Sequence, residues 1–466
     1  MTSPALTTRF TELLKTIEAS AAALRTGLES TSPDDPGAQI AASLGLPFHA
    51  NAQMAKQAAL LRVASERLAQ LVTPPRHVMF EAAGSFYVTL ALKAIANADV
   101  ATVIEDTDPN GVPAADLAKK VGMDEDMMSR LLRHLAAKGI FQEVAPSVWA
   151  NTDNSRAIAH QPEFRAHLDL AMYEGTLVLP HWPAFLAARA AGTQPAPLSP
   201  FALYSNNQPF YQWLHSAPST STTSDSAPTA ATSPEKEALA AAAHGRAANF
   251  NAAMKGMTRT EGVAFLPLDY PFHALPSSTT IIDVGGGLGS LPELVLPRAP
   301  HLKFVVQDLE GVVKQAKEGG ACEKWVGEGR VEFVVQDCFA PQPEEYGGGG
   351  NVFVLKSMLH NYPPGPALAI LKHIRAANPA RLLIIDRVVV PQLGAAFPST
   401  STSDAVQSLA IPTMYDLAMA ALHGGRARLL SEWEALLQEG GFKIAEGGVW
   451  AMRASTGQCV LECVPV

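Results

Sequence analysis

The sequence has little of what secreted, metal-binding or polyanion-binding proteins usually carry. Its 466 residues include only four cysteines, with no Cys-x-x-Cys pair and no regular spacing. Neither a disulfide framework nor a metal site is therefore predicted. Charged residues make up 17% of the chain and the formal net charge is −9, which argues against a general nucleic-acid binder. These absences favour a reducing compartment, and we expect a cytoplasmic location.

Long uncharged apolar runs are also missing. Residues 1–20 are interrupted by Arg9, Glu12, Lys15 and Glu18, so they lack the apolar core of a signal peptide. No uncharged run elsewhere is long enough to span a bilayer. With 47% apolar residues the chain can still build a large core, and its length allows two or three domains. We expect a soluble protein with no membrane partner.

The most informative stretch is a short apolar run followed by a glycine-rich turn. Residues 279–282 are rich in β-branched side chains, which is typical of a buried parallel strand, and Asp283 follows them. Gly285, Gly287 and Gly289 allow the chain to reverse tightly and to approach a ligand closely. A helix is expected to begin in the following segment, Ser290 to Pro300. A glycine turn between a strand and a helix is typical of nucleotide binding. Gly-x-Gly-x-Gly alone is weak, because dinucleotide-binding domains carry the similar Gly-x-Gly-x-x-Gly.

Further apolar runs follow in the order that a doubly wound sheet requires, at 302–309, 331–339 and 351–356. They carry Asp308, Asp337 and Lys356 at or near their carboxyl ends. Ligands of open α/β sheets bind beyond the carboxyl ends of the strands, so we expect these side chains to converge with Asp283. A single acid in such a place is usually a solvated strand end. Four successive strands that each end in a charged residue favour a binding site instead.

These motifs resemble the class I S-adenosylmethionine-dependent O-methyltransferases of the plant caffeate type and their fungal secondary-metabolism relatives, over most of the chain. Residues 283–289 resemble the family's first cofactor motif, 307–309 its ribose motif, and 336–339 its adenine motif. The resemblance implies a Rossmann-like, doubly wound α/β fold that binds S-adenosyl-L-methionine. The implied cofactor contacts are Asp283, Gly285, Gly287, Asp308, Leu309, Asp337, Cys338 and Lys356.

The stretch 356–362 resembles the family's Lys-x-x-x-His-Asp-Trp catalytic motif. The resemblance implies that His360 removes the proton of a substrate hydroxyl as its oxygen attacks the methyl group. Asp386 matches the carboxylate that orients this histidine in the family. Two family acids are absent: Ala427 replaces the acid of a Gly-Lys-Glu-Arg-Thr stretch, and Asn361 replaces the acid beside the histidine.

Two groups of apolar residues are candidates for the substrate pocket. Met414, Asp416 and Met419 resemble the segment that lines the pocket in the family, where thioethers pack against aromatic faces. Phe250 and Met254 lie in an apolar helical stretch suited to gripping a flat ring system. For the second group, ordinary core packing explains the pattern equally well.

The N-terminal part is predicted to be helical. Helices are expected at 6–28, 53–71 and 79–95, and a helix-turn-helix with a strand pair is expected at 111–151. Such a winged helix also reads DNA in other proteins. Here the second helix opens with the acids 124–126, which would face phosphates with the wrong sign. We therefore favour a structural role, and the family resemblance implies a homodimer built by the N-terminal helices.

The chain is expected to have three parts. Residues 1–155 form the N-terminal helical and winged-helix dimerisation domain, 156–262 a helical connector that lines the substrate pocket, and 263–466 the S-adenosylmethionine-binding catalytic domain. Two segments rich in Ser, Thr, Pro and Ala, 216–233 and 398–404, are predicted to be disordered insertions.

The leading hypothesis for function is O-methylation of a phenolic or enolic hydroxyl of a small, polyketide-like secondary metabolite. The absent family acids leave a second hypothesis open, a pericyclase or dehydratase that keeps S-adenosylmethionine bound without transferring its methyl group. The third hypothesis is a winged-helix regulatory protein. Neither sequence pattern nor resemblance names the substrate.

Overall fold

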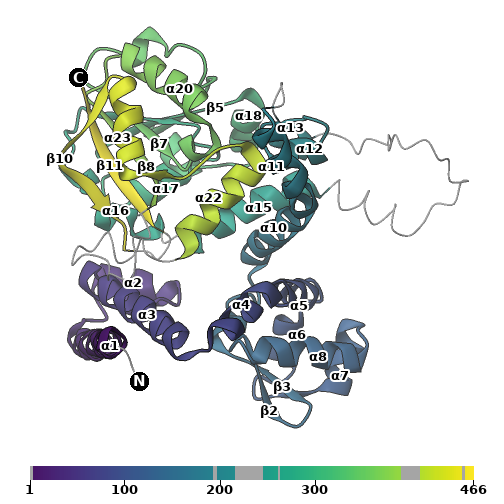
Figure 1. The fold of residues 1–466 in the computed structure, drawn as a ribbon. Coiled ribbons are helices and arrows are strands. Elements are labelled where there is room, and N and C mark those ends of the chain that lie inside the picture. The colour runs from purple at the N-terminus through teal and green to yellow at the C-terminus, as the bar shows by residue number, and fades with distance from the viewer. Residues whose placement is uncertain (1–3, 193–196, 216–244, 261–262, 390–409, 454–456) are drawn as a thin grey trace, which may run out of the picture. The chain divides into compact units, whose positions relative to one another are not determined.

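The fold is taken from a computed structural model, which describes residues 4–192, 197–215, 245–260, 263–389, 410–453 and 457–466. The chain divides into two units, a catalytic unit of Met1–Ala69 with Glu261–Val466 and a second unit of Gln70–Thr260 (Figure 1). The insertions predicted at 216–233 and 398–404 lie outside the described residues. The three-part division at 155 and 262 remains a prediction.

The catalytic unit is built on a mostly parallel sheet with the strand order β10-β11-β8-β7-β4-β5-β6. Strands β6, β5, β4, β7 and β8 run parallel, whereas β11 is antiparallel to both β8 and β10. The chain order reverses between β4 and β7, and this is where such sheets bind ligands. The strands are β4 (Thr280–Val284), β5 (Lys303–Asp308), β6 (Val331–Val335), β7 (Val352–Lys356), β8 (Arg381–Val389), β9 (Arg428–Leu429, paired with β8), β10 (Phe442–Ala451) and β11 (Gln458–Pro465).

Helices cover both faces of this sheet, which confirms the predicted Rossmann-like α/β fold. Strand β8 shows how: Leu383 and Ile385 enter one core, and Leu382 and Ile384 enter the other. Full burial of such a side chain stabilises the fold by about 1.5–3 kcal/mol. The first core is covered by α16 (Leu266–Asp269), α17 (Ser290–Val295), α18 (Glu310–Glu318) and α19 (Glu323–Gly327), and the second by α20 (Pro364–Ala376) and α23 (Leu430–Glu439).

The N-terminal helices belong to the catalytic unit. Leu24 and Met54 pack in one cluster with Phe265, which precedes the sheet. Arg453 adds polar contacts: its Nε lies 2.6 Å from an oxygen of Asp269, and its Nη1 donates to the Ala50 carbonyl at 2.7 Å. The elements are α1 (Pro4–Ser30), α2 (Pro36–Ser43), η1 (Pro47–His49) and α3 (Ala52–Val72), followed after the second unit by η3 (Val263–Phe265) and η4 (Phe272–Ala274).

The second unit contains the winged helix and a helical part. In the winged helix, Gly122 ends α7 in the left-handed conformation and Asp124 caps α8. A three-stranded sheet of order β1-β3-β2 forms the wing. The elements are α4 (Pro75–Gly84), α5 (Phe86–Asn97), α6 (Val100–Thr107), β1 (Val112–Pro113), α7 (Ala114–Val121), α8 (Glu125–Ala136), β2 (Phe141–Ala145), β3 (Val148–Asn151), α9 (Asp153–Arg156), α10 (Pro162–Val178), η2 (Leu179–His181), α11 (Trp182–Ala190), α12 (Pro200–Tyr204), α13 (Phe210–His215) and α15 (Arg246–Thr260).

Both arginines of α8 already have acidic partners. Arg130 lies 3.2 Å from Asp126 on the same helix, and Arg133 lies 2.8 Å from Glu143 on β2. Phosphate binding would have to compete with these carboxylates. The pairing supports the structural role that we favour for the winged helix.

Three expected element boundaries were wrong. The helix predicted at 79–95 is two helices, α4 and α5, because Gly84 and Ser85 stand at the junction and are weaker helix formers than alanine or leucine. Helix α17 ends at Val295, short of the expected proline at 300. Strand β6 ends at Val335, so Asp337 lies in the following loop.

The stretch Pro75–Asn97 is, among the described residues, the one helical segment long and apolar enough to cross a membrane by length and composition. It includes Arg76, Glu81 and Lys93, so it is not an uncharged run. Five of its large apolar side chains are exposed, with Phe80 at 80% and Met79 at 71%, whereas Ile95 is fully buried. Exposed apolar surface of this extent favours contact with a partner.

Candidate active site

The glycine turn after β4 has backbone angles that would be strained for residues other than glycine. Gly285, Gly287 and Gly289 have φ angles of 70°, 61° and 79°, in the left-handed region. At Gly286 a side chain is excluded by contact instead, because its Cβ would lie 2.6 Å from a carboxylate oxygen of Asp283. The turn therefore keeps its backbone open at the carboxyl end of β4.

Asp283 is fully buried beneath this turn, and neither of its carboxylate oxygens has a hydrogen-bond partner within the described residues. Burial raises its pKa to about 7, against the opposing charge of Lys356 on β7. Burial also lowers the pKa of Lys356, although the negative charges of Asp283 and Asp386 oppose this shift. A buried carboxylate without donors is costly unless a ligand supplies them. Asp283 thus fits a ligand that carries an ammonium group.

Asp308 ends β5 next to the same turn. Its Oδ2 accepts from the Gly287 backbone N–H at 2.9 Å, and its Oδ1 accepts from the Leu309 N–H at 2.8 Å. Burial raises the pKa of Asp308, and these two N–H groups oppose the shift. An ionised carboxylate has about four acceptor positions, so two N–H groups leave capacity for ligand hydroxyls.

The predicted adenine motif forms a loop after β6. Asp337 is exposed, and its Oδ1 accepts from the Phe339 N–H at 2.9 Å. Burial raises the pKa of the Cys338 thiol to about 11, so the thiol is neutral at physiological pH. The ring of Phe339 meets the ring of Tyr362 edge-on with centroids 5.2 Å apart. The loop is thus joined to the stretch that carries His360, while Leu309 remains 59% exposed.

His360 lies in the short turn η6 (Leu359–Asn361) after β7, and Asp386 lies near the end of β8. The His360 Nδ1 is 2.6 Å from the Asp386 Oδ1, and both side chains are buried. The Asp386 carboxylate also accepts from the backbone N–H groups of His360 at 3.3 Å and Arg387 at 2.8 Å. The carboxylate therefore fixes both the backbone and the ring of His360.

Helix α22 (Ala410–His423) carries three of the predicted substrate-binding residues. Met414 is 57% exposed, and Asp416 and Met419 are half-buried. The Asp416 Oδ1 accepts from the backbone N–H of Ala427 at 2.9 Å, so this aspartate supports the segment where the family acid is missing. Burial raises the pKa of Asp416.

Phe250 and Met254 lie on α15, in the second unit. Both are half-buried, and the Phe250 ring meets those of Phe210 and Tyr211 edge-on at 5.9 Å. The expected cluster of aromatic side chains therefore exists in this unit. Its role in substrate binding remains a prediction.

Three cationic or basic residues near the His360–Asp386 pair were not predicted from the sequence. Arg428 is almost fully buried, and its guanidinium donates to two carbonyls of the His360 turn. His423 is half-buried at the end of α22, and burial together with the charge of His360 lowers its pKa to about 3, which keeps it neutral. The Arg387 guanidinium lies 3.5 Å from the centre of the Tyr415 ring. A single charged residue produces no periodic pattern in the sequence. The departure from the family motif around 427 was the one indication that this region is unusual.

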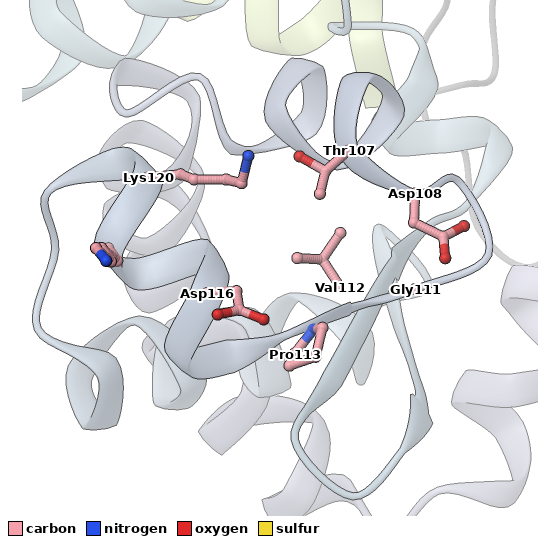
Figure 2. A pocket seen from close by; sticks show the side chains of 8 residues that line it. Thr107, Asp108, Gly111, Val112, Pro113, Asp116 and Lys120 are labelled. Atoms are coloured by element: carbon pink, nitrogen blue, oxygen red, sulfur yellow. The ribbon is translucent and has the colours of Figure 1, made fainter.

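A separate hollow lies on the winged helix, in the second unit. Figure 2 shows the side chains that line it, with Val112 below those of Lys120 and Thr107 in this view. Its lining combines two lysines and two aspartates and includes no histidine or cysteine. It offers no arrangement comparable with the His360–Asp386 pair. The residues are Thr107, Asp108, Gly111, Val112, Pro113, Asp116, Lys119 and Lys120.

Comparison with known proteins identifies two domains in the chain. Residues 238–443 match the model of the O-methyltransferase domain, and residues 80–161 match the O-methyltransferase dimerisation domain. A curated relative, the O-methyltransferase tpcA of Aspergillus fumigatus, is 25% identical over 95% of this chain and 94% of its own. The two models together match more than half of the chain, on both units.

Solved structures share the fold. The structure of LepI in complex with SAM has a TM-score of 0.66 and 18% identity, covering 97% of this chain and all of the other. The O-methyltransferase NcsB1, in complex with S-adenosylmethionine and 2-hydroxy-5-methyl naphthoic acid, has a TM-score of 0.55 and 23% identity, covering 82% of this chain and 96% of its own. The matched O-methyltransferase domain and the curated relative tpcA identify an S-adenosylmethionine-dependent O-methyltransferase. The chain belongs to the O-methyltransferase family whose members combine a dimerisation domain with this catalytic domain.

Proposed function

We propose that this protein methylates a phenolic or enolic hydroxyl of a small secondary metabolite, with His360 as the general base and Asp386 as its orienting acid. The observation that carries the proposal is the 2.6 Å contact between the His360 Nδ1 and the Asp386 Oδ1. The relative tpcA is an O-methyltransferase, and NcsB1 binds a hydroxylated naphthoic acid. The first supports an oxygen as the acceptor atom, and the second supports a hydroxyl on a flat ring system.

The residues around the glycine turn fit S-adenosylmethionine. Asp283 would pair with its ammonium group, because the buried carboxylate oxygens of Asp283 lack donors within the described chain. Asp308 would accept the ribose hydroxyls, and Asp337, Cys338 and Leu309 would border the adenine. When bound, S-adenosylmethionine supplies a methyl group on a sulfonium, which is a strong electrophile. Lys356 would balance the charge of Asp283 on the neighbouring strand.

The chain's own residues supply the proton acceptor. With its Nδ1–H donated to Asp386, the imidazole presents its Nε2 lone pair to a substrate hydroxyl. The hydroxyl proton moves to Nε2 as the oxygen becomes nucleophilic, and Asp386 stabilises the imidazolium that results. Burial of the pair excludes water, which strengthens this electrostatic support. Met414, Asp416 and Met419 would line the substrate site from α22.

The exposed apolar face of α4 and α5 supports a homodimer. Met79, Phe80, Phe86, Tyr87 and Leu90 are each more than half exposed, and the matched dimerisation domain includes most of them. A second copy of the chain would cover this face, and none of the five side chains carries a charge that would have to be buried.

A rearrangement catalyst that retains the methyl group is the second candidate. It is favoured by Ala427, which is buried and places a methyl group where the family has an acid. In that case Lys356 and the sulfonium would polarise a substrate carbonyl, and loss of Lys356 would reduce turnover more than loss of His360.

The deciding experiment counts S-adenosylhomocysteine formed per molecule of product, with phenolic acceptors and purified protein. A ratio near one supports methyl transfer, and product formed without S-adenosylhomocysteine overturns it. His360→Ala should lower turnover by about 10²–10⁴, the range for a general base, while affinity for S-adenosylmethionine is retained. A matched control is His160→Ala, which removes a histidine paired with Asp106 on the surface of the second unit. Turnover unchanged in His360→Ala would reject His360 as the base.

A further inference from the structure

A deeply buried cation of the catalytic unit lies beside the His360 turn and has no part in the chemistry proposed above. The Arg428 side chain is 2% exposed. Its Nη1 donates to the Leu359 carbonyl at 3.0 Å, and its Nη2 donates to the Tyr362 carbonyl at 2.8 Å. One guanidinium therefore holds the residues on both sides of His360 and Asn361.

The residues just before Arg428 also contact the His360 turn. The Arg426 backbone N–H donates to the His360 carbonyl at 2.9 Å. A Cβ placed at Gly425 would lie 2.1 Å from that carbonyl oxygen, so only glycine allows the approach. Three carbonyls of the stretch 359–362 thus accept hydrogen bonds from residues 426–428.

Arg428 is itself anchored to the framework that carries Asp386. It pairs with Val388 in the short parallel contact between β9 and β8, two residues after Asp386. Its guanidinium lies 5.0 Å from the centre of the Trp433 ring, and Trp433 is fully buried on α23. Displacement of Arg428 would therefore change the position of His360 relative to Asp386.

The burial of this cation is costly, which points to a specific use. Burial lowers the pKa of Arg428, and the negative charge of Asp386 opposes the shift. A planar guanidinium can hold two carbonyls at fixed separation, whereas an ammonium on a flexible stem cannot. The neighbouring residue is Ala427, so in this chain the segment contacts the His360 turn through backbone groups and Arg428 instead of an acid.

We propose that Arg428 is a positioning residue for catalysis: its two hydrogen bonds fix the η6 turn so that the His360 imidazole stays aligned between Asp386 and the acceptor hydroxyl. The inference rests on the proposed function of His360 as the base. Misplacement of a reacting group by about 1 Å can cost about 10²-fold in rate, so loss of this grip should be visible in turnover.

The test is a double-mutant cycle of Arg428→Met and His360→Ala, with affinity for S-adenosylmethionine measured by calorimetry. Arg428→Met should lower kcat by about 10- to 100-fold, within the cost of a misplaced catalytic group. Cofactor affinity should stay within about twofold, because Arg428 contacts none of the proposed cofactor residues in the described chain. In the His360→Ala background, Arg428→Met should change kcat by less than about twofold, since a positioning residue acts through the group that it positions.

Two further variants separate this role from general stability. Arg62→Met is the matched control, because the exposed Arg62 guanidinium pairs with Glu66 on the surface of α3, and it should keep kcat within about twofold. Arg428→Lys should lower turnover as Arg428→Met does, because lysine keeps the positive charge but lacks the planar guanidinium that holds two carbonyls. The proposal is overturned by full activity in Arg428→Met or Arg428→Lys, by equal losses in both His360 backgrounds, or by loss of cofactor binding together with turnover. If His360→Ala alone keeps full turnover, it is the proposed function that fails.

Discussion

The His360 Nδ1 and the Asp386 Oδ1 are 2.6 Å apart although 26 residues separate them in the chain. The contact joins the loop after β7 to the end of the adjacent parallel strand β8. In such a contact Nδ1 carries the proton and donates it in a hydrogen bond to the carboxylate. Nε2 then holds the lone pair and is the basic atom. The next prediction depends on this assignment.

Asp386→Asn should lower kcat by about 10²–10⁴, because an amide can hold the imidazole in the wrong tautomer and cannot stabilise the imidazolium. The KM for S-adenosylmethionine should change little, and initial rates at saturating cofactor provide the measurement. Full turnover in the folded variant would mean that the carboxylate has no part in the reaction.

Asp308→Ala should weaken S-adenosylmethionine binding by about 1.5–3 kcal/mol, the range for hydrogen bonds to a charged group. Isothermal titration calorimetry measures this directly. Glu310→Gln is the matched control, since that carboxylate is exposed two residues further along the chain and should leave affinity unchanged. Equal affinities in wild type and Asp308→Ala would contradict the ribose assignment.

Stability should fall as the pH rises towards neutrality because of Asp283. The pKa of Asp283 is about 7 in the folded protein and 3.8 in its ordinary state. Between these values the folded chain holds a proton that the unfolded chain has released. The contribution of Asp283 to the free energy of unfolding therefore decreases from about pH 4 to about pH 7. Denaturant titrations of wild type and Asp283→Asn should converge at low pH and diverge near pH 7, with Asp283→Asn the more stable.

Cofactor binding should have the opposite pH dependence. The ionised form of Asp283 pairs with an ammonium group, so affinity for S-adenosylmethionine should increase between about pH 5.5 and 7.5. Asp283→Asn should bind more weakly and lose most of this dependence. Calorimetry in buffers of different ionisation enthalpy would also detect the proton released by Asp283. A pH-independent affinity in wild type would argue that Asp283 does not meet the ammonium.

Phe80→Glu should shift the protein from dimer to monomer. Phe80 is 80% exposed on α4, and burial of such a ring contributes about 1.5–3 kcal/mol, which a buried carboxylate would reverse. Sedimentation velocity provides the measurement. Val326→Glu changes a similarly apolar residue, 45% exposed on α19, and should leave the assembly unchanged. A monomeric wild-type protein would remove the basis for this prediction.

Much of the catalytic fold is predictable because parallel strands and glycine turns leave local signals. The β-branched run before Asp283 and the glycines after it identify β4 and its turn, and the strands carrying Asp308, Lys356 and Asp386 follow from similar apolar runs. The adjacency of His360 and Asp386 required the family resemblance, since no pattern specifies which strand ends meet. Arg428 escaped notice because its partners are backbone carbonyls, which carry no residue identity.

The division of the chain gives less local signal. Residues 1–69 read as amphipathic helices with no mark of what they pack against, yet Met54 and the Ala50 carbonyl meet Phe265 and Arg453 in the catalytic unit. Such contacts connect residues about 200 to 400 positions apart, far beyond any periodicity in the sequence.

The contact of Arg453 with Ala50 has a consequence for recombination between relatives. A single crossover after the winged helix would combine one parent's N-terminal helices with the other parent's Phe265 and Arg453, so the apolar cluster and the hydrogen bond of Arg453 to the Ala50 carbonyl would have to tolerate foreign partners. Chimaeras that exchange substrate preference should instead use two crossovers, near 69 and 260, so that the first helices travel with the catalytic unit they pack against.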